Sequence, residues 1–205
     1  DFILAIGGGV ISDLIGFSAS IFRRGIDFGF IPTTFLSMID ACFGGKNAVN
    51  FTEVKNLIGT ITQPSIIFLI PEFLSTLDKK EILSGFAEFV KYLLLDDNFY
   101  KHFIHDFSKF IKEKINFKTF SAFPYEKLKE FFIKNPKYLL KALNIKYKFL
   151  KDDLFDKNRR QILNLGHTIG HGLELNLKLS HGISLYPAII LELIIVDELR
   201  FLNQN

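Results

Sequence analysis

The chain has 205 residues, of which 48% are hydrophobic and 23% are charged, and its formal net charge is +3. This composition is typical of a globular protein rather than a disordered one, and the length suits one large or two small domains. The small charge and the lack of a Lys- and Arg-rich tract argue against nucleic acid as a partner. The apolar runs are too short to cross a membrane, and the single Cys42 cannot form an internal disulfide, so we expect a cytoplasmic protein.

The N-terminal third of the chain alternates strand-like and helix-like segments, which is the pattern of an α/β fold. A short apolar run at 2–6 predicts a buried strand, and the three glycines after it lead into an amphipathic stretch at 10–22 that predicts a helix. The elements expected next are a strand at 27–34, a short helix at 34–43, a turn and strand at 44–51 and a buried strand at 65–70.

Beyond residue 77 the sequence predicts helices and no strand. Residues 77–95 repeat apolar side chains with helical periodicity, behind Asp78 as a suitable N-cap. Further helices are expected at 98–150, with one break near Phe123–Pro124, at 160–175 and at 184–202. We therefore expect an α/β domain over residues 1–72, followed by an all-α domain over residues 73–205.

The sequence AIGGGVISDLIGF at 5–17 places three glycines between a strand and the start of a helix. Glycine lets the backbone approach a ligand closely, and the free N–H groups at a helix N-terminus favour an anion, so the turn suits a phosphate. The pattern differs from the GxGxxG fingerprint of dinucleotide binding. A plain strand-to-helix turn is therefore an equal alternative on these residues alone.

Two further segments carry polar side chains of interest. The sequence IDACFGGKNAVNFTEVKN gathers Asp40, Lys46 and Lys55 around a Gly-Gly turn, which suits binding of phosphate or carboxylate, although a polar hairpin is the simpler interpretation of any one of them. In GFAEFVKYLLL, Glu88 and Lys91 share one face of a helix that is apolar almost all round. Because a buried carboxylate needs a cation or a metal beside it, this pair favours a functional site over an exposed ion pair.

Three histidines, His167, His171 and His181, lie close together in the last part of the chain. Four residues turn a helix by about 400°, so His167 and His171 are about 40° apart around the axis and roughly 6 Å apart along it, and both can face one cavity. Two histidines and a glutamate form a common zinc site with an open position for substrate. The spacing does not decide which two histidines bind a metal, and a helical histidine taken alone is more often structural.

These segments, in this order, resemble the 3-dehydroquinate synthase family of sugar-phosphate cyclases. The matching sequences, which extend over most of residues 3–175, are GGGVISDLIGFSAS, RRGIDF, IPTTFLSMIDACFGGKNAVN, KNLIGTITQP, FLSTL, GFAEFVKY and RRQILNLGHTIGHGLE. The region at 98–140 matches only in its helical character. Because the chain begins without Met and directly in strand-like sequence, we expect that it lacks the N-terminal portion of the family. The resemblance implies that C-terminal helices of the family are missing as well.

The resemblance implies a Rossmann-like NAD-binding α/β domain, here partial, followed by an all-α metal-binding domain, with the active site between them. It implies a lyase that uses NAD and Zn²⁺ or Co²⁺. Its substrate would be a phosphorylated sugar acid, 3-deoxy-D-arabino-heptulosonate 7-phosphate, which it would convert to 3-dehydroquinate and phosphate in the shikimate pathway of aromatic amino acid biosynthesis. It also implies a homodimer, because Arg24 would reach the phosphate in the neighbouring subunit's site.

Carried over residue by residue, the resemblance assigns a role to each candidate. The metal ligands would be Glu88, His167 and His181. The catalytic residues would be His171, which would handle protons, and Asp40 and Lys91, which would contact the substrate hydroxyls. The other substrate-binding side chains would be Arg24, Lys46, Lys55, Asn56, Lys146, Arg160 and Asn164. The contacts to NAD would come from Gly8, Gly9, Asp13, Thr33, Thr34 and Thr76.

The sequence departs from the family pattern at Ile183, where glutamate is usual after His-Gly, and at Asp156, where the family also has glutamate. Three alternative functions remain open. Another sugar-phosphate cyclase would act on a substrate without the carboxylate that Lys146 and Arg160 would bind. A metal-dependent polyol dehydrogenase would need no phosphate-binding lysines, and a truncated remnant would have the fold without turnover.

Overall fold

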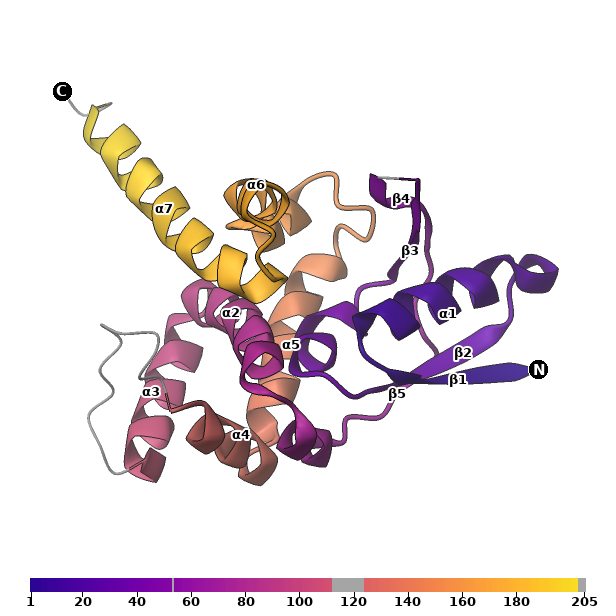
Figure 1. The fold of residues 1–205 in the computed structure, drawn as a ribbon, viewed down its shortest axis with the longest axis horizontal. Coiled ribbons are helices and arrows are strands. Elements are labelled where there is room, and N and C mark those ends of the chain that lie inside the picture. The colour runs from indigo at the N-terminus through magenta and orange to yellow at the C-terminus, as the bar shows by residue number, and fades with distance from the viewer. Residues whose placement is uncertain (53, 112–123, 203–205) are drawn as a thin grey trace.

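The computed structural model describes residues 1–52, 54–111 and 124–202. The strands gather at one end of the molecule, and helices make up the rest (Figure 1). The change occurs at the short helix η3 (Pro71–Thr76), after which every described element is helical. The described residues thus form an α/β part followed by a helical part. Within these residues, no helix is both long enough and apolar enough to cross a membrane.

Three parallel strands form a sheet in the order β1-β2-β5: β1 (Phe2–Gly7), β2 (Asp27–Pro32) and β5 (Ile66–Ile67). The connection from β1 to β2 consists of α1 (Gly9–Ile21) and the short helix η1 (Phe22–Arg24). Gly7 pairs with Pro32, so β1 and β2 end at the same edge of the sheet. The glycine turn after β1 and the threonines after β2 therefore lie at one edge, where ligands bind in open α/β sheets.

Two of these strands are less buried than their apolar sequences predict. In β1, Ala5 is buried towards α1, whereas Phe2 and Ile6 on the other face are 51% and 59% exposed. The buried strand predicted at 65–70 is reduced to the two residues of β5, and Ile66 is 42% exposed. A continuous apolar run predicts a strand that is buried on both faces. Burial of each face requires other elements of the fold to pack over it, and the sequence of the strand does not supply them.

A hairpin follows the first two strands and packs against α1; its strands are β3 (Lys46–Phe51) and β4 (Val54–Ile61). β3 confirms the strand predicted at 44–51. β4 was not predicted, because its sequence VKNLIGTI has no clear alternation of polar and apolar residues. The helix predicted at 34–43 is present as a helical segment that ends in the π-helical turn η2 (Ser37–Ala41).

The helical part contains α2 (Lys79–Leu95), α3 (Asp97–Ile111), α4 (Tyr125–Lys134) and α5 (Lys137–Leu150). Asp78 caps α2 as predicted, since its Oδ1 accepts a hydrogen bond from the N–H of Glu81 at 2.8 Å. The break predicted near Phe123–Pro124 lies partly outside the described residues. A second break, at Asn135–Pro136, was not predicted; the residue before a proline avoids helical backbone, and Asn135 ends α4 with φ −130° and ψ 61°.

Aromatic rings form the core of the helical part. The ring of Phe89 on α2 lies edge-on against Phe99 and Phe103, at centroid distances of 5.3 and 5.0 Å. Each such pair adds about 0.5–1.5 kcal/mol to the stabilisation that comes from burial. Phe89 directly follows Glu88, so the core fixes the part of α2 that carries this carboxylate.

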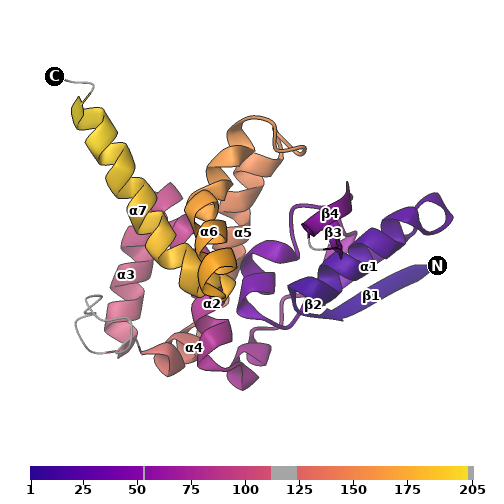
Figure 2. The ribbon, with the colours of Figure 1, turned by 45° about the horizontal axis from the view of Figure 1, so that its top comes forward.

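The single helix predicted at 160–175 is interrupted. Residues Arg159–Asn164 form the 3₁₀ helix η5, the chain then leaves the helical path, and α6 (His167–Leu177) begins after Gly166. α7 (His181–Leu202) begins before the predicted position at 184 and continues through a proline. α7 lies across α2, and its C-terminal half extends away from the other helices (Figure 2).

The aromatic core generates a prediction for stability. Phe103→Ala is expected to lower the free energy of unfolding by about 3–5 kcal/mol, because Phe103 is 1% exposed and the helices cannot close the resulting cavity completely. Urea unfolding followed by circular dichroism measures this change. The matched control is Phe155→Ala, at a ring that is 64% exposed, where a change within about 0.5 kcal/mol is expected. Equal effects of the two substitutions would contradict the role of the core.

Candidate active site

A cavity of about 470 Å³ lies where the hairpin, α2, α5, η5, α6 and the start of α7 meet. Asp156 and Glu174, which were not predicted as site residues, belong to its lining. The predicted site residues that line it are Asp40, Lys46, Lys55, Asn56, Glu88, Lys91, Lys146, Arg160, Asn164, His167, His171 and His181. Polar side chains that are far apart in the sequence therefore meet in one place.

A larger cavity, of about 920 Å³, lies between α5 and the ends of β2 and β5. Its lining is apolar except for Asn144 and Tyr147, and it contains none of the predicted site residues. The smaller cavity, with its carboxylates, imidazoles and amines, is therefore the candidate active site despite its lesser volume.

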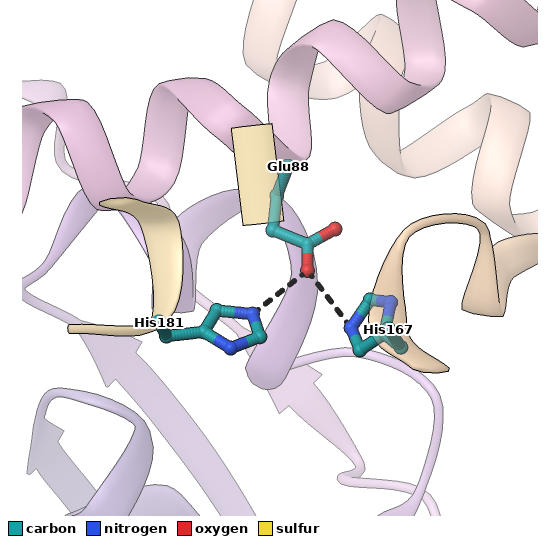
Figure 3. A group of neighbouring side chains, drawn as sticks. All are labelled: Glu88, His167 and His181. Carbon is teal, nitrogen blue, oxygen red and sulfur yellow. Dashed lines mark hydrogen bonds and ion pairs between the residues drawn. The ribbon is translucent and has the colours of Figure 1, made fainter. Parts of the chain in front are cut away.

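Glu88, His167 and His181 converge on one point (Figure 3). Oε1 of Glu88 lies 3.3 Å from Nε2 of His167 and 3.1 Å from Nε2 of His181, and all three ligand atoms lie within 4.8 Å of one another. Two imidazole nitrogens and one carboxylate oxygen are the protein ligands of many catalytic zinc sites, which keep a position open for water or substrate. These three side chains therefore fit a divalent ion of this type.

The buried pair of Glu88 and Lys91 is confirmed: the two residues are 0% and 1% exposed, and Oε2 of Glu88 forms an ion pair with Nζ of Lys91. Burial by itself would raise the pKa of Glu88. The charge of Lys91 and the hydrogen bonds from the two histidines outweigh burial and hold this pKa well below its usual value. Glu88 is therefore ionised, and this is the form that binds a metal.

The break before α6 orients His167. Gly166 has φ +82°, a left-handed conformation that favours glycine, and makes His167 the first residue of α6. The carboxylate of Glu192 on α7 accepts a hydrogen bond from the N–H of Gly166 at 2.6 Å, which stabilises an amide at the helix N-terminus. The carbonyl of Leu165 lies 3.4 Å from Nδ1 of His167, so Nε2 is the nitrogen that faces Glu88.

His181 is the first residue of α7 and reaches Glu88 because α7 approaches α2 closely. A Cβ atom on Gly182 would lie 2.1 Å from Cα of Ser84, so the approach requires glycine at this position. Ile183, which replaces the usual glutamate, is 37% exposed. The departure from the family pattern therefore does not prevent His181 from joining the other two ligands.

Glu174 was missed in the sequence analysis, although it ends the sequence GHTIGHGLE. Its Oε1 lies 2.7 Å from Nδ1 of His181, and its Oε2 lies 3.4 Å from Nζ of Lys55. Glu174 lies about two helical turns beyond His167 and so shares the face of α6 that carries the histidines. This spacing is the signal that could have identified it.

His171 lies beside the three ligands. Its ring centroid is 5.5 Å from that of His167 and 6.5 Å from that of His181. Burial lowers the pKa of His171, which favours the neutral imidazole, a form able to accept a proton. A second group of close ligand atoms combines His171 with Glu174 and His181, so two groups of side chains compete for His181.

Two buried cations, Lys146 on α5 and Arg160 on η5, meet beside Gly44. They are 6% and 3% exposed. Arg160 donates a hydrogen bond to the carbonyl of Gly44 at 3.0 Å. A Cβ atom on Gly44 would lie 3.0 Å from Nη2 of Arg160 and 3.2 Å from Nζ of Lys146, so glycine leaves room for both side chains. Adjacent cations of this kind suit a carboxylate, which a guanidinium can bind with two hydrogen bonds.

Asp40, at the end of η2, joins the α/β part to this pair. Its Oδ1 lies 2.8 Å from Nζ of Lys146 and accepts a hydrogen bond from the hydroxyl of Tyr92 at 2.6 Å. Burial would raise the pKa of Asp40, but the charge of Lys146 lowers it overall. Asp40 is therefore ionised and held in place from α2 and α5. The sequence analysis did not identify Tyr92 as its partner.

Polar side chains of the hairpin also line the cavity. Nζ of Lys46 lies 2.5 Å from Oδ2 of Asp156, which also accepts a hydrogen bond from Asn164 at 3.5 Å. The side chains of Lys46 and Lys55 are 52% and 69% exposed. Both ammonium groups are therefore accessible to an anion. Asn56, which was predicted to bind substrate, lies next to Lys55 in the same lining.

Several of the predicted NAD-binding residues lie together outside this lining. Gly8 and Gly9 lead into α1, which has no side-chain N-cap, so its first amides are free to bind an anion. A Cβ atom on Gly8 would lie 2.9 Å from Cγ2 of Thr34, which places Thr33 and Thr34 beside the turn. Asp13 lies on α1, and the nearby charges of Asp40 and Lys146 affect its pKa.

Two predicted residues are more distant. Thr76 ends η3, where its hydroxyl donates a hydrogen bond to the carbonyl of Phe73 at 3.1 Å. Arg24 is exposed at the end of η1 and is not part of the cavity lining within this chain. The structure therefore does not join either residue to the other predicted contacts.

The ligand geometry predicts different outcomes for two neighbouring histidines. His167→Ala is expected to abolish binding of Zn²⁺, because two ligands would remain, whereas His171→Ala is expected to retain the metal. Isothermal titration calorimetry with Zn²⁺ measures both. Loss of the metal in His171→Ala would show instead that the group of His171, Glu174 and His181 binds it.

The raised pKa of Asp13 predicts that the stability of the protein depends on pH. Burial and the nearby Asp40 raise its pKa from 3.8 to about 6, against the opposing effect of Lys146. Between these two values the folded protein binds more protons than the unfolded chain, so the contribution of Asp13 to stability falls as the pH rises through this window. Asp13→Asn is therefore expected to raise the free energy of unfolding at neutral pH, by an amount on the order of 1 kcal/mol after allowance for solvent screening.

Urea unfolding of this variant and of the unchanged protein, at about pH 4 and at neutral pH, measures the effect. The gain in stability should be smaller at the lower pH, where Asp13 is protonated in the folded state. A loss of stability at neutral pH would show that the ionised carboxylate stabilises the fold.

Comparisons with known proteins place these observations in a family. Family models described as the N-terminal and C-terminal regions of 3-dehydroquinate synthase match residues 1–84 and 85–205. The chain is 39% identical over 208 residues to the 3-dehydroquinate synthase of Saccharolobus solfataricus, an alignment that covers 100% of this chain and 54% of that protein. It is 37% identical over 205 residues to the pentafunctional AROM polypeptide of Pneumocystis carinii, covering 99% of this chain and 13% of that protein. The chain thus spans about half the length of the 3-dehydroquinate synthase that it matches.

Solved structures share the fold. The 2-epi-5-epi-valiolone synthase of Streptomyces hygroscopicus subsp. jinggangensis, with NAD⁺ and Zn²⁺ bound, has a TM-score of 0.70 at 30% identity, over 91% of this chain and 48% of that one. A 2-deoxy-scyllo-inosose synthase in complex with carbaglucose-6-phosphate, NAD⁺ and Co²⁺ has a TM-score of 0.69 at 26% identity, over 91% of this chain and 47% of that one. Since the two family models together match residues 1–84 and 85–205, the chain belongs to the 3-dehydroquinate synthase family.

Proposed function

We propose that the protein is a 3-dehydroquinate synthase, a lyase that converts 3-deoxy-D-arabino-heptulosonate 7-phosphate to 3-dehydroquinate and phosphate in the shikimate pathway. One observation carries the proposal: a site for a divalent metal and the cation pair of Lys146 and Arg160 line the same cavity. The proposed substrate offers hydroxyl groups that a metal can bind and a carboxylate that adjacent cations can bind. The identity to 3-dehydroquinate synthases supports the same assignment.

The charges of the cavity suit a substrate with two anionic groups. Four carboxylates face five cations in the lining, the cations being Lys46, Lys55, Lys91, Lys146 and Arg160. A divalent ion at Glu88 would raise the excess of positive charge further. A phosphate and a carboxylate on one substrate would balance this excess.

The two anionic groups of the substrate would bind different residues of the cavity lining. Lys146 and Arg160, with Asn164 nearby, would bind the carboxylate. Lys46 and Asn56 on the hairpin would bind the phosphate, because their side chains line the cavity and are exposed. The ring of the substrate would then lie next to Glu88 and the histidines of the same lining.

The proposed cofactors fit the residues that are present. Zn²⁺ or Co²⁺ would be held by Glu88, His167 and His181. The uncapped N-terminus of α1 behind Gly8 and Gly9 would accept NAD, in a partial Rossmann-like domain that ends near residue 72. When bound, NAD would accept and return a hydride, and the metal would polarise substrate oxygens.

Three side chains would act directly on the substrate. His171, whose pKa is lowered by burial, would accept a proton and return it in a later step. Asp40 and Lys91 would form hydrogen bonds to substrate hydroxyls, since both line the cavity beside the metal ligands. Their fixed ion pairs, to Lys146 and Glu88, would hold them in position before substrate binds.

The proposal includes a homodimer, which the resemblance to the family implies through Arg24. Arg24 is exposed and lies outside the cavity of its own chain. In a dimer it would reach the phosphate bound in the cavity of the partner subunit. A cytoplasmic location would agree with a phosphorylated, small-molecule substrate.

The pair of Lys146 and Arg160 also distinguishes the proposal from related cyclases. One structural relative was solved with carbaglucose-6-phosphate, which has no carboxylate. Two buried, adjacent cations would then face no anionic group of the substrate. A substrate that carries a carboxylate is therefore the better match for this cavity.

An assay of phosphate release tests the proposal. With NAD⁺ and Zn²⁺ present, the protein is expected to release phosphate from 3-deoxy-D-arabino-heptulosonate 7-phosphate without net accumulation of NADH. Removal of the metal with a chelator should abolish release, and Zn²⁺ or Co²⁺ should restore it. The matched control is glucose 6-phosphate, on which no release is expected.

Other results of this assay would support the alternatives. Faster turnover of glucose 6-phosphate or sedoheptulose 7-phosphate would indicate another sugar-phosphate cyclase, and net NADH would indicate a polyol dehydrogenase. Absence of phosphate release from every substrate would contradict the proposed activity and favour a non-catalytic remnant.

A further inference from the structure

Glu174 contacts the imidazole of His181 on the side opposite to Glu88. Oε1 of Glu174 lies 2.7 Å from Nδ1 of His181, while Nε2 of the same ring lies 3.1 Å from Oε1 of Glu88. The side chain of Glu174 is 10% exposed, so little water competes for this contact. Each nitrogen of the ring therefore has its own carboxylate, one on α6 and one on α2.

This contact decides which nitrogen of His181 can bind a metal. A neutral imidazole carries one proton, and only the nitrogen without the proton has a lone pair for a metal. A carboxylate accepts a hydrogen bond from a protonated nitrogen, so Glu174 at 2.7 Å holds a proton on Nδ1. A metal would replace the hydrogen bond between Nε2 and Glu88, and Nε2 would then be the free ligand atom.

We infer that Glu174 is a positioning residue of the metal site, which fixes the orientation and the protonated nitrogen of His181 without binding the ion itself. The inference rests on the proposed metal site of Glu88, His167 and His181. The alternative group of His171, Glu174 and His181 would instead make Glu174 a ligand. In that group Glu174 could not hold the proton of Nδ1 and bind the metal through the same oxygen.

The two metal-binding histidines are held differently. Nδ1 of His167 faces the neutral carbonyl of Leu165 at 3.4 Å, whereas Nδ1 of His181 faces a charged carboxylate at 2.7 Å. Hydrogen bonds to an ionised group are roughly twice as strong as neutral ones. His181 therefore has the stronger restraint at Nδ1, although each of the two histidines is the first residue of its helix.

The second partner of Glu174 provides a matched control. Nζ of Lys55 lies 3.4 Å from Oε2 of Glu174, and the lysine side chain is 69% exposed. Exposed ion pairs of this kind contribute little to stability. Lys55→Met therefore removes one partner of the same carboxylate while leaving its contact with His181.

The test is the affinity for Zn²⁺, measured by competition with a chelating dye in the absence of substrate. Glu174→Ala is expected to weaken Zn²⁺ binding by about 10- to 100-fold. Glu174→Gln should recover part of the loss, because its amide oxygen still accepts a hydrogen bond from Nδ1. Lys55→Met should change the affinity by less than about twofold. Thermal unfolding of the metal-free variants verifies that they are folded.

A spectroscopic measurement separates positioning from general stability. With Co²⁺ in place of Zn²⁺, the visible absorption spectrum depends on ligand geometry. It should change in Glu174→Ala and remain unchanged in Lys55→Met.

Two outcomes would overturn the inference. Unchanged Zn²⁺ affinity in Glu174→Ala would show that the contact has no positioning role. Complete loss of the metal in Glu174→Gln, Glu174→Ala and His171→Ala alike would show that Glu174 is a ligand. Because these measurements need no turnover, a failed phosphate-release assay would count against the proposed function and leave the role of Glu174 to be decided by metal binding.

Discussion

The carboxylate of Glu88 is buried inside the protein, and the arrangement of the surrounding helices depends on it. An ionised carboxylate without water is costly unless charges and hydrogen bonds compensate it. Lys91 compensates one oxygen from the same helix, and His167 and His181 compensate the other from α6 and α7. Three helices, α2, α6 and α7, therefore meet at the carboxylate of Glu88. Their meeting also creates a site where a divalent ion could replace the hydrogen bonds between Glu88 and the two histidines.

Packing and backbone conformation make this meeting possible. The aromatic core around Phe89 holds α2, Gly182 lets α7 approach it, and Gly166 with Glu192 fixes the start of α6. Phe89, Gly182 and Gly166 each lie one residue from a candidate metal ligand. Small displacements of these helices would therefore move the ligand atoms directly, since the ligands occupy helix starts or the buried face of a helix.

Polar contacts join the α/β part to the helical part across the cavity. Asp40 pairs with Lys146, and the carbonyl of Gly44 accepts a hydrogen bond from Arg160. Lys46 of the hairpin also pairs with Asp156. The cations in these contacts, Lys146, Arg160 and Lys46, also suit a substrate with a phosphate and a carboxylate. The same side chains would therefore connect the two parts of the protein and bind the substrate.

The sequence by itself determined the local features of this protein. Spacing and burial pattern predicted the pair of Glu88 and Lys91, the cap at Asp78 and the shared face of His167 and His171, because each depends on residues within one or two helical turns. The resemblance to a family supplied the grouping of ligands, which spacing left open. Only the tertiary structure decided that His181 approaches Glu88 despite Ile183, that Glu174 contacts His181, and that Phe2 and Ile6 of β1 are exposed. Each of these features depends on how segments that are far apart in the sequence pack against each other. The local sequence around a residue does not specify which distant segment will pack against it.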